Sequence, residues 1–417
     1  MLMWVVGLYS LYTLLRIYLS IMQIGYVNQE KRKEAVILPS GKYLVAGNYA
    51  VAKEKLAIVD SFIDYLVFLW FIFAGFEWLQ GLVGSSGMSS SLLFLLGFFA
   101  INFIVSLPFT IYSKFKIDKE FGFNQMTPKM FIIDTIKSTL IFLIFGGLIF
   151  SLLVWIIENF NSWWFWGFAL LFSVSLLLNI IYPTIIAPLF NKFTPLEDSS
   201  LKSSIEAMMA KVGLSSDGIF VMDASKRDTR LNAYFGGLGK SKRVVLFDTL
   251  LEKLTDKELL AVLGHELGHY SHKDIWKNIS MMGAFLFVAF YTFGHLPNEL
   301  FTQIGVVPNG GVILAMIILL LPIMSFVYTP IMSFVSRHNE YEADKFGSKM
   351  GGKENLISAL MKLVKENKSF PKSDPIYSKF YYSHPPIIER LKALGLDVDK
   401  PLPKDGIFQF INSDEDK

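Results

Sequence analysis

Seven long apolar segments constrain this chain more than any other feature of its sequence. Each is long enough to cross about 30 Å of hydrocarbon as a helix. The expected membrane spans are residues 2–24, 62–82, 91–112, 138–158, 163–188, 275–296 and 311–333. Hydrophobic residues make up 53% of the 417 positions and charged residues only 18%, so a soluble core could not hide this much apolar surface. The sequence therefore predicts an all-α multi-pass membrane protein.

The composition also excludes several kinds of function. The chain has no cysteine, which removes thiolate metal sites, cysteine nucleophiles and disulfides from consideration. Its 39 Lys and Arg against 36 Asp and Glu leave a net charge of +3, too balanced to indicate a nucleic-acid partner. Function is therefore expected to depend on His, Asp, Glu, Ser or Tyr side chains in a membrane protein, with membrane lipids as partners.

Lysine and arginine are distributed unequally between the loops. The connection at 25–60 has five lysines and Arg32, and that at 113–137 has five lysines, whereas those near 83–90, 159–162 and 297–310 have neither lysine nor arginine. Basic loops stay on the cytoplasmic side, so we expect the N-terminus outside and the C-terminus inside. The compact chain has no obvious retrieval signal for the endoplasmic reticulum. That favours a bacterial plasma membrane, with the endoplasmic reticulum membrane as the eukaryotic alternative.

The first span could be mistaken for a signal peptide. It lacks a basic start and its apolar stretch is too long, so we expect it to be retained as a helix. Arg16 lies inside this span, where an arginine is expected to face a polar interior.

Spans and polar stretches divide the chain into four parts. Residues 1–188 hold the first five expected spans with their loops, and residues 275–333 hold the last two. The polar stretches 189–274 and 334–417 are both expected on the cytoplasmic side. Together they are predicted to form one small globular domain.

An HExxH motif at His265, Glu266 and His269 is the most informative short pattern. Two imidazoles four residues apart lie on one face of a helix, which lets both bind one zinc ion, and the adjacent glutamate can take a proton from water. Thr255 and Glu258 form a predicted capping box that begins the helix. The competing interpretation is a buried histidine pair without metal.

A third ligand must come from elsewhere in the chain, and three residues compete for this role. His272 is too far along the helix axis, while His338 and Glu340 both follow the last span. The last two spans form an antiparallel hairpin that brings this segment to the same face as the HExxH motif. We favour Glu340, because Asp344 lies four residues on and suits a carboxylate that orients a zinc-bound imidazole.

Several motifs occur in an order that resembles the type I CAAX prenyl proteases, and the resemblance covers most of the chain. They are Ala187–Pro195, Asn232–Leu238, Lys242–Leu251, His265–His269, Glu340–Asp344 and Ser383–Arg390. The resemblance implies a zinc endopeptidase with seven transmembrane helices arranged as a barrel around a chamber, and with a small zincin-like α+β catalytic domain. It also implies removal of the last three residues of isoprenylated proteins.

Carried over by position, the resemblance implies specific roles for the motif residues. His265, His269 and Glu340 become the ligands of one zinc ion per chain, Glu266 the catalytic base, and Asp344 the residue that orients a ligand.

Two further motifs are expected to contact substrate. His384 precedes two prolines that begin a helix through Arg390, and its imidazole is expected to meet the substrate or the developing oxyanion. Asn232, Ala233 and Tyr234 are predicted to lie on a strand whose open edge pairs with an extended peptide. Arg390 is counted with these substrate contacts.

Two alternatives to a prenyl protease remain. One is a quality-control zinc protease for membrane proteins that needs no prenyl group. The other, from a different class, is a transporter-like membrane protein whose metal site is not catalytic. The sequence does not determine the oligomeric state.

Overall fold

Helices make up most of the computed structural model, which describes residues 1–214, 218–237 and 242–398. Six helical runs in this part of the chain are long and apolar enough to cross a membrane. They are α1 (Leu2–Glu30), α2 to α3 (Ser40–Val83), α4 with a following π-helix (Met88–Asp118), α5 to α6 (Pro128–Asn159), α7 with its last turns (Trp163–Leu189) and α13 (Gly310–Gly351). The protein is therefore a mostly helical, multi-pass membrane protein.

Short non-α segments interrupt or extend several of these runs. Within α2 to α3, the α-helix Ser40–Trp70 passes through the π-helix Phe71–Gly75 into Phe76–Val83. In the other runs, π-helices cover Tyr112–Asp118, Phe142–Gly146 and Tyr182–Ile186, and a 3-10 turn covers Ala187–Leu189. The α-helices themselves are α4 (Met88–Ile111), α5 (Pro128–Ile141), α6 (Gly147–Asn159) and α7 (Trp163–Ile181).

Each of these six runs contains one expected span but extends beyond it. The difference arises because the helices continue as polar helices past the apolar segments, as α2 does from Ser40 to the expected start at 62. The expected span 275–296 forms α11 (Asp274–Gly294), which is not among the six. Asp274, Lys277 and Asn278 make the first turns of α11 polar. A seventh span and a barrel are therefore not confirmed.

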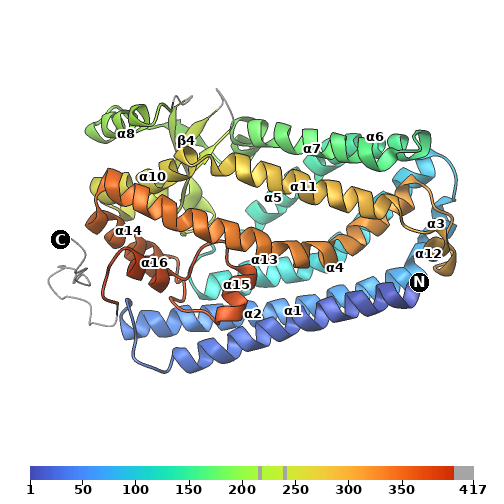
Figure 1. The fold of residues 1–417 in the computed structure, drawn as a ribbon, viewed down its shortest axis with the longest axis horizontal. Helices are drawn as coiled ribbons and strands as arrows, with labels where there is room; N and C mark the ends of the chain where they lie inside the picture. The colour runs from blue at the N-terminus through green and yellow to red at the C-terminus, as the bar shows by residue number, and fades with distance from the viewer. Residues whose placement is uncertain (215–217, 238–241, 399–417) are drawn as a thin grey trace, which may run out of the picture.

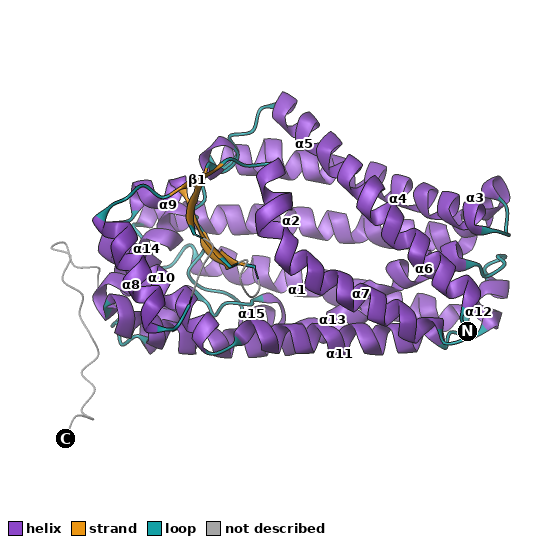
Figure 2. Cartoon of the chain, turned by 90° about the horizontal axis from the view of Figure 1, so that it is seen from above, coloured by secondary structure: helices purple, strands orange, loops and turns teal. Residues whose placement is uncertain are grey.

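A small sheet lies where the bundle meets the polar end of the molecule (Figure 2). Its strand order is β1-β2-β4-β3, with β1 (Phe193–Pro195), β2 (Ile219–Met222), β3 (Ala233–Gly236) and β4 (Arg243–Phe247). β4 pairs parallel with β2 and antiparallel with β3, where Ala233 lies opposite Leu246. The expected strands at 232–235 and 242–247 are thus confirmed, and β3 is an edge strand.

Short helices surround this sheet at the same end of the molecule (Figure 1). They are α8 (Ser200–Lys211), a 3-10 turn (Ala224–Lys226), α9 (Asp248–Lys253), α10 (Asp256–Ser271), α14 (Lys353–Glu366), α15 (Pro375–Tyr381) and α16 (Ile387–Ala393). The remaining helix, α12 (Asn298–Gln303), lies at the opposite end, near the N-terminus. Ala359 of α14 joins one apolar core with Val244 of β4 and Leu263 of α10, so both polar stretches pack together. Residues 399–417 of the second stretch lie outside the described part.

α13 connects the two ends of the molecule. Its 42 residues form one continuous helix of about 63 Å, capped at its start by the Asn309 side chain. The apolar half, including Val312 and Leu320, belongs to the core of the bundle. The polar half packs against α10 and α14. One uninterrupted helix, with Pro322 and Pro330 inside it, thus extends from the bundle to the polar end of the molecule.

Candidate metal centre

The helix α10 begins where the sequence predicted. The Thr255 hydroxyl accepts a hydrogen bond from the amide of Glu258, whose carboxylate accepts one from the amide of Thr255 at 2.8 Å. Lys362 donates to the same carboxylate at 2.7 Å. The predicted capping box is confirmed, and it fixes the position of the HExxH residues along the helix.

α10 and α13 approach each other closely because glycines lie where the two helices meet. The glycines lie four residues apart on each helix, at Gly264, Gly268, Gly347 and Gly351. A Cβ atom on Gly347 would lie 2.7 Å from the backbone nitrogen of His265, and one on Gly351 would lie 2.3 Å from the Cα of Ala261. No side chain fits at such distances, so this contact requires glycine and brings the two backbones together.

Three of the predicted ligands meet at this contact. His265, His269 and Glu340 each offer one ligand atom, and the three atoms lie within 4.8 Å of one another. Nε2 of His265 lies 3.5 Å from one carboxylate oxygen of Glu340, and Nε2 of His269 lies 3.3 Å from the other. His272 and His338, the other candidates for the third ligand, do not belong to this group.

Separate carboxylates orient the two imidazoles through their Nδ1 atoms. Nδ1 of His265 lies 2.8 Å from Asp344 Oδ1, and the Arg390 guanidinium donates two hydrogen bonds to the same carboxylate, at 2.8 and 2.7 Å. Arg390 Nη1 also lies 3.3 Å from Glu340. Both Nε2 atoms are therefore turned towards Glu340.

The second imidazole is oriented by a group that sequence reasoning missed. Nδ1 of His269 lies 2.9 Å from Asp274 Oδ2, at the first residue of α11. Lys277 donates to Asp274 at 2.7 Å and to the side chain of Asn339 at 3.2 Å. The spacing of five residues between His269 and an acid is visible in the sequence, but Asp274 falls at the end of the polar stretch 189–274, and no role is predicted for it.

The residues present fit a metal ion. Oε2 of Glu340 is buried and accepts no hydrogen bond, although cationic or imidazole nitrogens lie 3.3 to 3.5 Å away. An unsatisfied buried carboxylate oxygen is costly, and a cation would satisfy it. Two imidazole nitrogens and one carboxylate oxygen, each held from behind by another group, are typical donors for zinc in a catalytic site.

Glu266 lies beside this cluster in a cavity of about 470 Å³, which His269 of α10 and Gly236 of β3 also line. Burial raises the pKa of Glu266 above its ordinary value. A raised pKa suits a carboxylate that must take up a proton and release it again. The edge strand β3 thus borders the same cavity as the candidate base.

His384 contacts Glu340 from a different cavity than the one that contains Glu266. Its Nε2 lies 3.2 Å from Glu340 Oε1, and its Nδ1 lies 3.0 Å from the hydroxyl of Ser383. The side chain is 62% exposed and lines a second cavity, of about 530 Å³. His384 thus lies next to the ligand group, and its predicted contact with the substrate or the oxyanion stays a prediction.

The remaining residues that were predicted to contact substrate make contacts within the protein. The guanidinium of Arg390 is engaged by Asp344 and Glu340, which favours a positioning role over the predicted contact with substrate. The Asn232 side chain accepts a hydrogen bond from the amide of Ala233, and Tyr234 packs against Phe247. Substrate pairing with Asn232, which precedes β3, and with Ala233 and Tyr234 of β3 stays a prediction.

Comparison with known proteins agrees with this geometry. Residues 195–396 match peptidase family M48, and residues 30–192 match the family described as CAAX prenyl protease N-terminal, five membrane helices. CAAX prenyl protease 1 of Saccharomyces cerevisiae is 38% identical over 335 residues, covering 76% of this chain and 74% of that protein. The Homo sapiens homolog is 35% identical over 398 residues, covering 84% of this chain and 82% of its own.

A solved structure extends the similarity to the whole fold. The crystal structure of S. mikatae Ste24p superposes with a TM-score of 0.84 at 33% identity, covering 94% of this chain and 97% of that one. The proteins named here are eukaryotic, so the expected bacterial source stays a prediction. The chain belongs to peptidase family M48, among the homologues of CAAX prenyl protease 1, and it is a membrane metalloendopeptidase.

Proposed function

We propose that this protein is a zinc-dependent endopeptidase that removes the C-terminal three residues of isoprenylated proteins. One observation carries the proposal: Glu266 shares a cavity with His269, at the three-residue ligand group, next to the edge strand β3. The names of the relatives supply the substrate class, since they are CAAX prenyl proteases. A membrane location also suits a lipidated substrate, because the bilayer concentrates a prenyl chain near the site.

The residues of the chain divide the work of hydrolysis. His265, His269 and Glu340 would hold the ion, which supplies Lewis-acid polarisation of the scissile carbonyl and a more acidic water. Glu266 takes the proton of the attacking water on its carboxylate and delivers it to the leaving amine. β3 pairs with the extended substrate backbone through its free edge.

His384 has the geometry to stabilise the oxyanion. When the Ser383 hydroxyl donates to Nδ1, the proton of His384 resides on Nε2, which points towards the ligand group. An Nε2–H in that position donates a hydrogen bond to the carbonyl oxygen as negative charge develops on it. Oxyanion donors of this kind contribute about 10²–10³ in rate.

Glu266→Gln tests the proposed mechanism. The variant should bind one zinc per chain, measured by elemental analysis, and lose cleavage of a farnesylated CAAX peptide by a factor of about 10² or more. Retained cleavage would contradict the role of Glu266. The unprenylated peptide is the control for the substrate class, because equal turnover of both peptides would favour a quality-control protease.

We also propose that α11 is a seventh span, with the N-terminus outside and the metal centre on the cytoplasmic side. α11 lies along α7 and α13, so it crosses the bilayer wherever they do (Figure 1). The basic loops at 25–60 and 113–137 support the orientation.

The absence of native cysteine makes this topology easy to test. A single cysteine at exposed Ser40 should react with a membrane-impermeant maleimide only after the membrane is opened, whereas one at exposed Ser86 should react in intact cells. Labelling of both positions from the same side would contradict the proposed orientation.

A further inference from the structure

The cavity that contains His384 also contains a lysine that the mechanism does not use. Helices α2, α14 and α15 and the segment around His384 line it, with Lys53 of α2 among the lining residues. Because His384 and Arg390 both contact Glu340, this cavity of about 530 Å³ adjoins the candidate metal centre. A peptide held at the metal can therefore extend into it.

Other charged groups in this cavity are already engaged. The Glu54 carboxylate accepts a hydrogen bond from the Tyr377 hydroxyl at 2.6 Å. The charge of Arg390 is balanced by Asp344 and Glu340.

The ammonium groups of the two lysines that line the cavity differ in their exposure to solvent and in their nearest partners. Nζ of Lys368 lies 4.1 Å from the Phe123 ring centroid, and burial lowers the pKa of this lysine. Lys53 is exposed, and its nearest recorded partner is the Tyr49 ring at 5.6 Å, with no carboxylate pair among the described residues. Lys53 is therefore the ammonium group with the least compensation in this cavity.

The cavity on the other side of the metal centre has a different lining. It contains Glu266 and His269, and reaches Ile275 and the exposed Trp276 at the start of α11. Its two lysines are Lys242, which lies 4.2 Å from the Tyr270 ring centroid, and Lys273. The apolar side chains of Ile275 and Trp276 suit the lipidated side of a substrate better than its carboxylate.

We propose that the cavity with His384 takes the residues after the scissile bond, and that Lys53 binds the C-terminal carboxylate of the substrate. This inference rests on the proposed function, in which three residues follow the scissile bond and span about 10 Å. A free carboxylate must then lie near the metal centre, and the ammonium group of Lys53, for which no carboxylate pair is found among the described residues, is its natural partner in the adjoining cavity.

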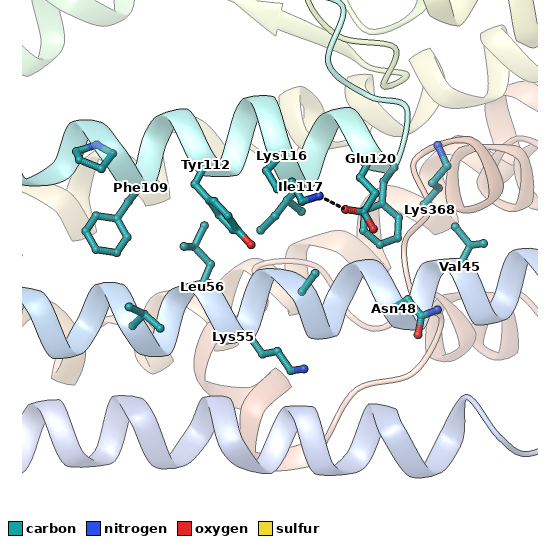
Figure 3. Close-up of a pocket in the computed structure, with 14 residues that line it drawn as sticks. Val45, Asn48, Lys55, Leu56, Phe109, Tyr112, Lys116, Ile117, Glu120 and Lys368 are labelled. Carbon is teal, nitrogen blue, oxygen red and sulfur yellow. Dashed lines mark ion pairs between the residues drawn. The ribbon is translucent and has the colours of Figure 1, made fainter.

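Lys55 provides a matched control on the same helix. It is exposed and lies two residues after Lys53, where it lines a different groove, of about 1020 Å³, between α2 and the end of α4 (Figure 3). In that groove Lys116 pairs with Glu120 at 3.5 Å. Removing Lys55 changes the charge of α2 as much as removing Lys53 does, but leaves the cavity with His384 unchanged.

The test compares a farnesylated peptide that ends in a free carboxylate with the same peptide ending in an amide. Wild-type protein should show a KM about fivefold higher for the amide, with similar kcat. Lys53→Met should raise the KM for the free acid to that of the amide and leave the amide unchanged. Lys53→Arg should restore most of the preference, and Lys55→Met should behave as wild type.

Two results would overturn the inference: equal KM values for acid and amide in wild type, or equal effects of Lys53→Met on both peptides. Loss of the preference in Lys273→Met instead would place the carboxylate in the other cavity. Calorimetric binding of the tripeptide product, as acid and as amide, separates this inference from the proposed function. If the tripeptide acid binds more tightly than the amide, and only when Lys53 is present, then Lys53 binds the carboxylate even if the protein cleaves no prenylated peptide.

Discussion

The two imidazoles of the metal centre are oriented by regions with different properties. On the interior side, His265 is held by Asp344 and Arg390, and the Arg390 side chain is only 9% exposed. On the side of α11, His269 is held by Asp274 and Lys277, and the Lys277 side chain is 47% exposed. Charges interact more strongly where water is excluded. The interior side should therefore contribute more to the stability of the site than the side formed by α11 does.

Arg390→Met should have the largest effect on this comparison. It leaves the carboxylates of Asp344 and Glu340 buried without their shared cation, which costs about 3–5 kcal/mol when a buried ion pair is broken. The measurement is the thermal unfolding midpoint in detergent, with the exposed Arg32→Met as control. An unchanged midpoint would show that the interior side does not depend on Arg390.

Asp344→Asn and Asp274→Asn compare the two sides directly. Loss of a carboxylate that orients a metal ligand lowers metal affinity by about 10- to 100-fold. We expect the larger loss for Asp344, whose side chain is bound by Arg390 in the interior. Competition with a fluorescent zinc chelator measures both affinities. Equal losses, or a larger loss for Asp274, would reverse the proposed ranking of the two sides.

Lys277→Met should have the smallest effect, because its side chain is half exposed and its pairing with Asp274 is screened by water. Zinc affinity should fall by about threefold or less. Lys345→Met is the matched control, since Lys345 pairs with Glu342 on the outer face of α13, away from the ligand group. A loss comparable to that of Asp274→Asn would mean that Lys277 sets the position of Asp274.

Much of this site could be predicted from local patterns. The HExxH spacing, the capping box and the alternation of apolar segments are each set by neighbours in sequence, and the structure has the expected α10 and ligand group. The third ligand could be inferred because a helical hairpin returns the chain to the same end of the molecule.

Other features depend on contacts between distant segments and were missed. The link from Asp274 through Lys277 to Asn339 joins α11 to α13, and no local pattern specifies it. The engagement of Arg390 likewise needed the position of α16. The glycine pairs at 264/268 and 347/351 were a readable signal of close helix packing that sequence reasoning left unused.

The continuity of α13 has a consequence for how its apolar part can vary. Because the segment within the bundle and Glu340 belong to one uninterrupted helix, inserting or deleting a single residue in that segment rotates the carboxylate by about 100° and moves it by about 1.5 Å relative to the bundle. Substitutions in the apolar half change its packing in the core but not the position of Glu340 along the helix, whereas a change in its residue count moves Glu340. In a thicker or thinner bilayer, α13 must then adapt by tilting rather than by changing its number of residues.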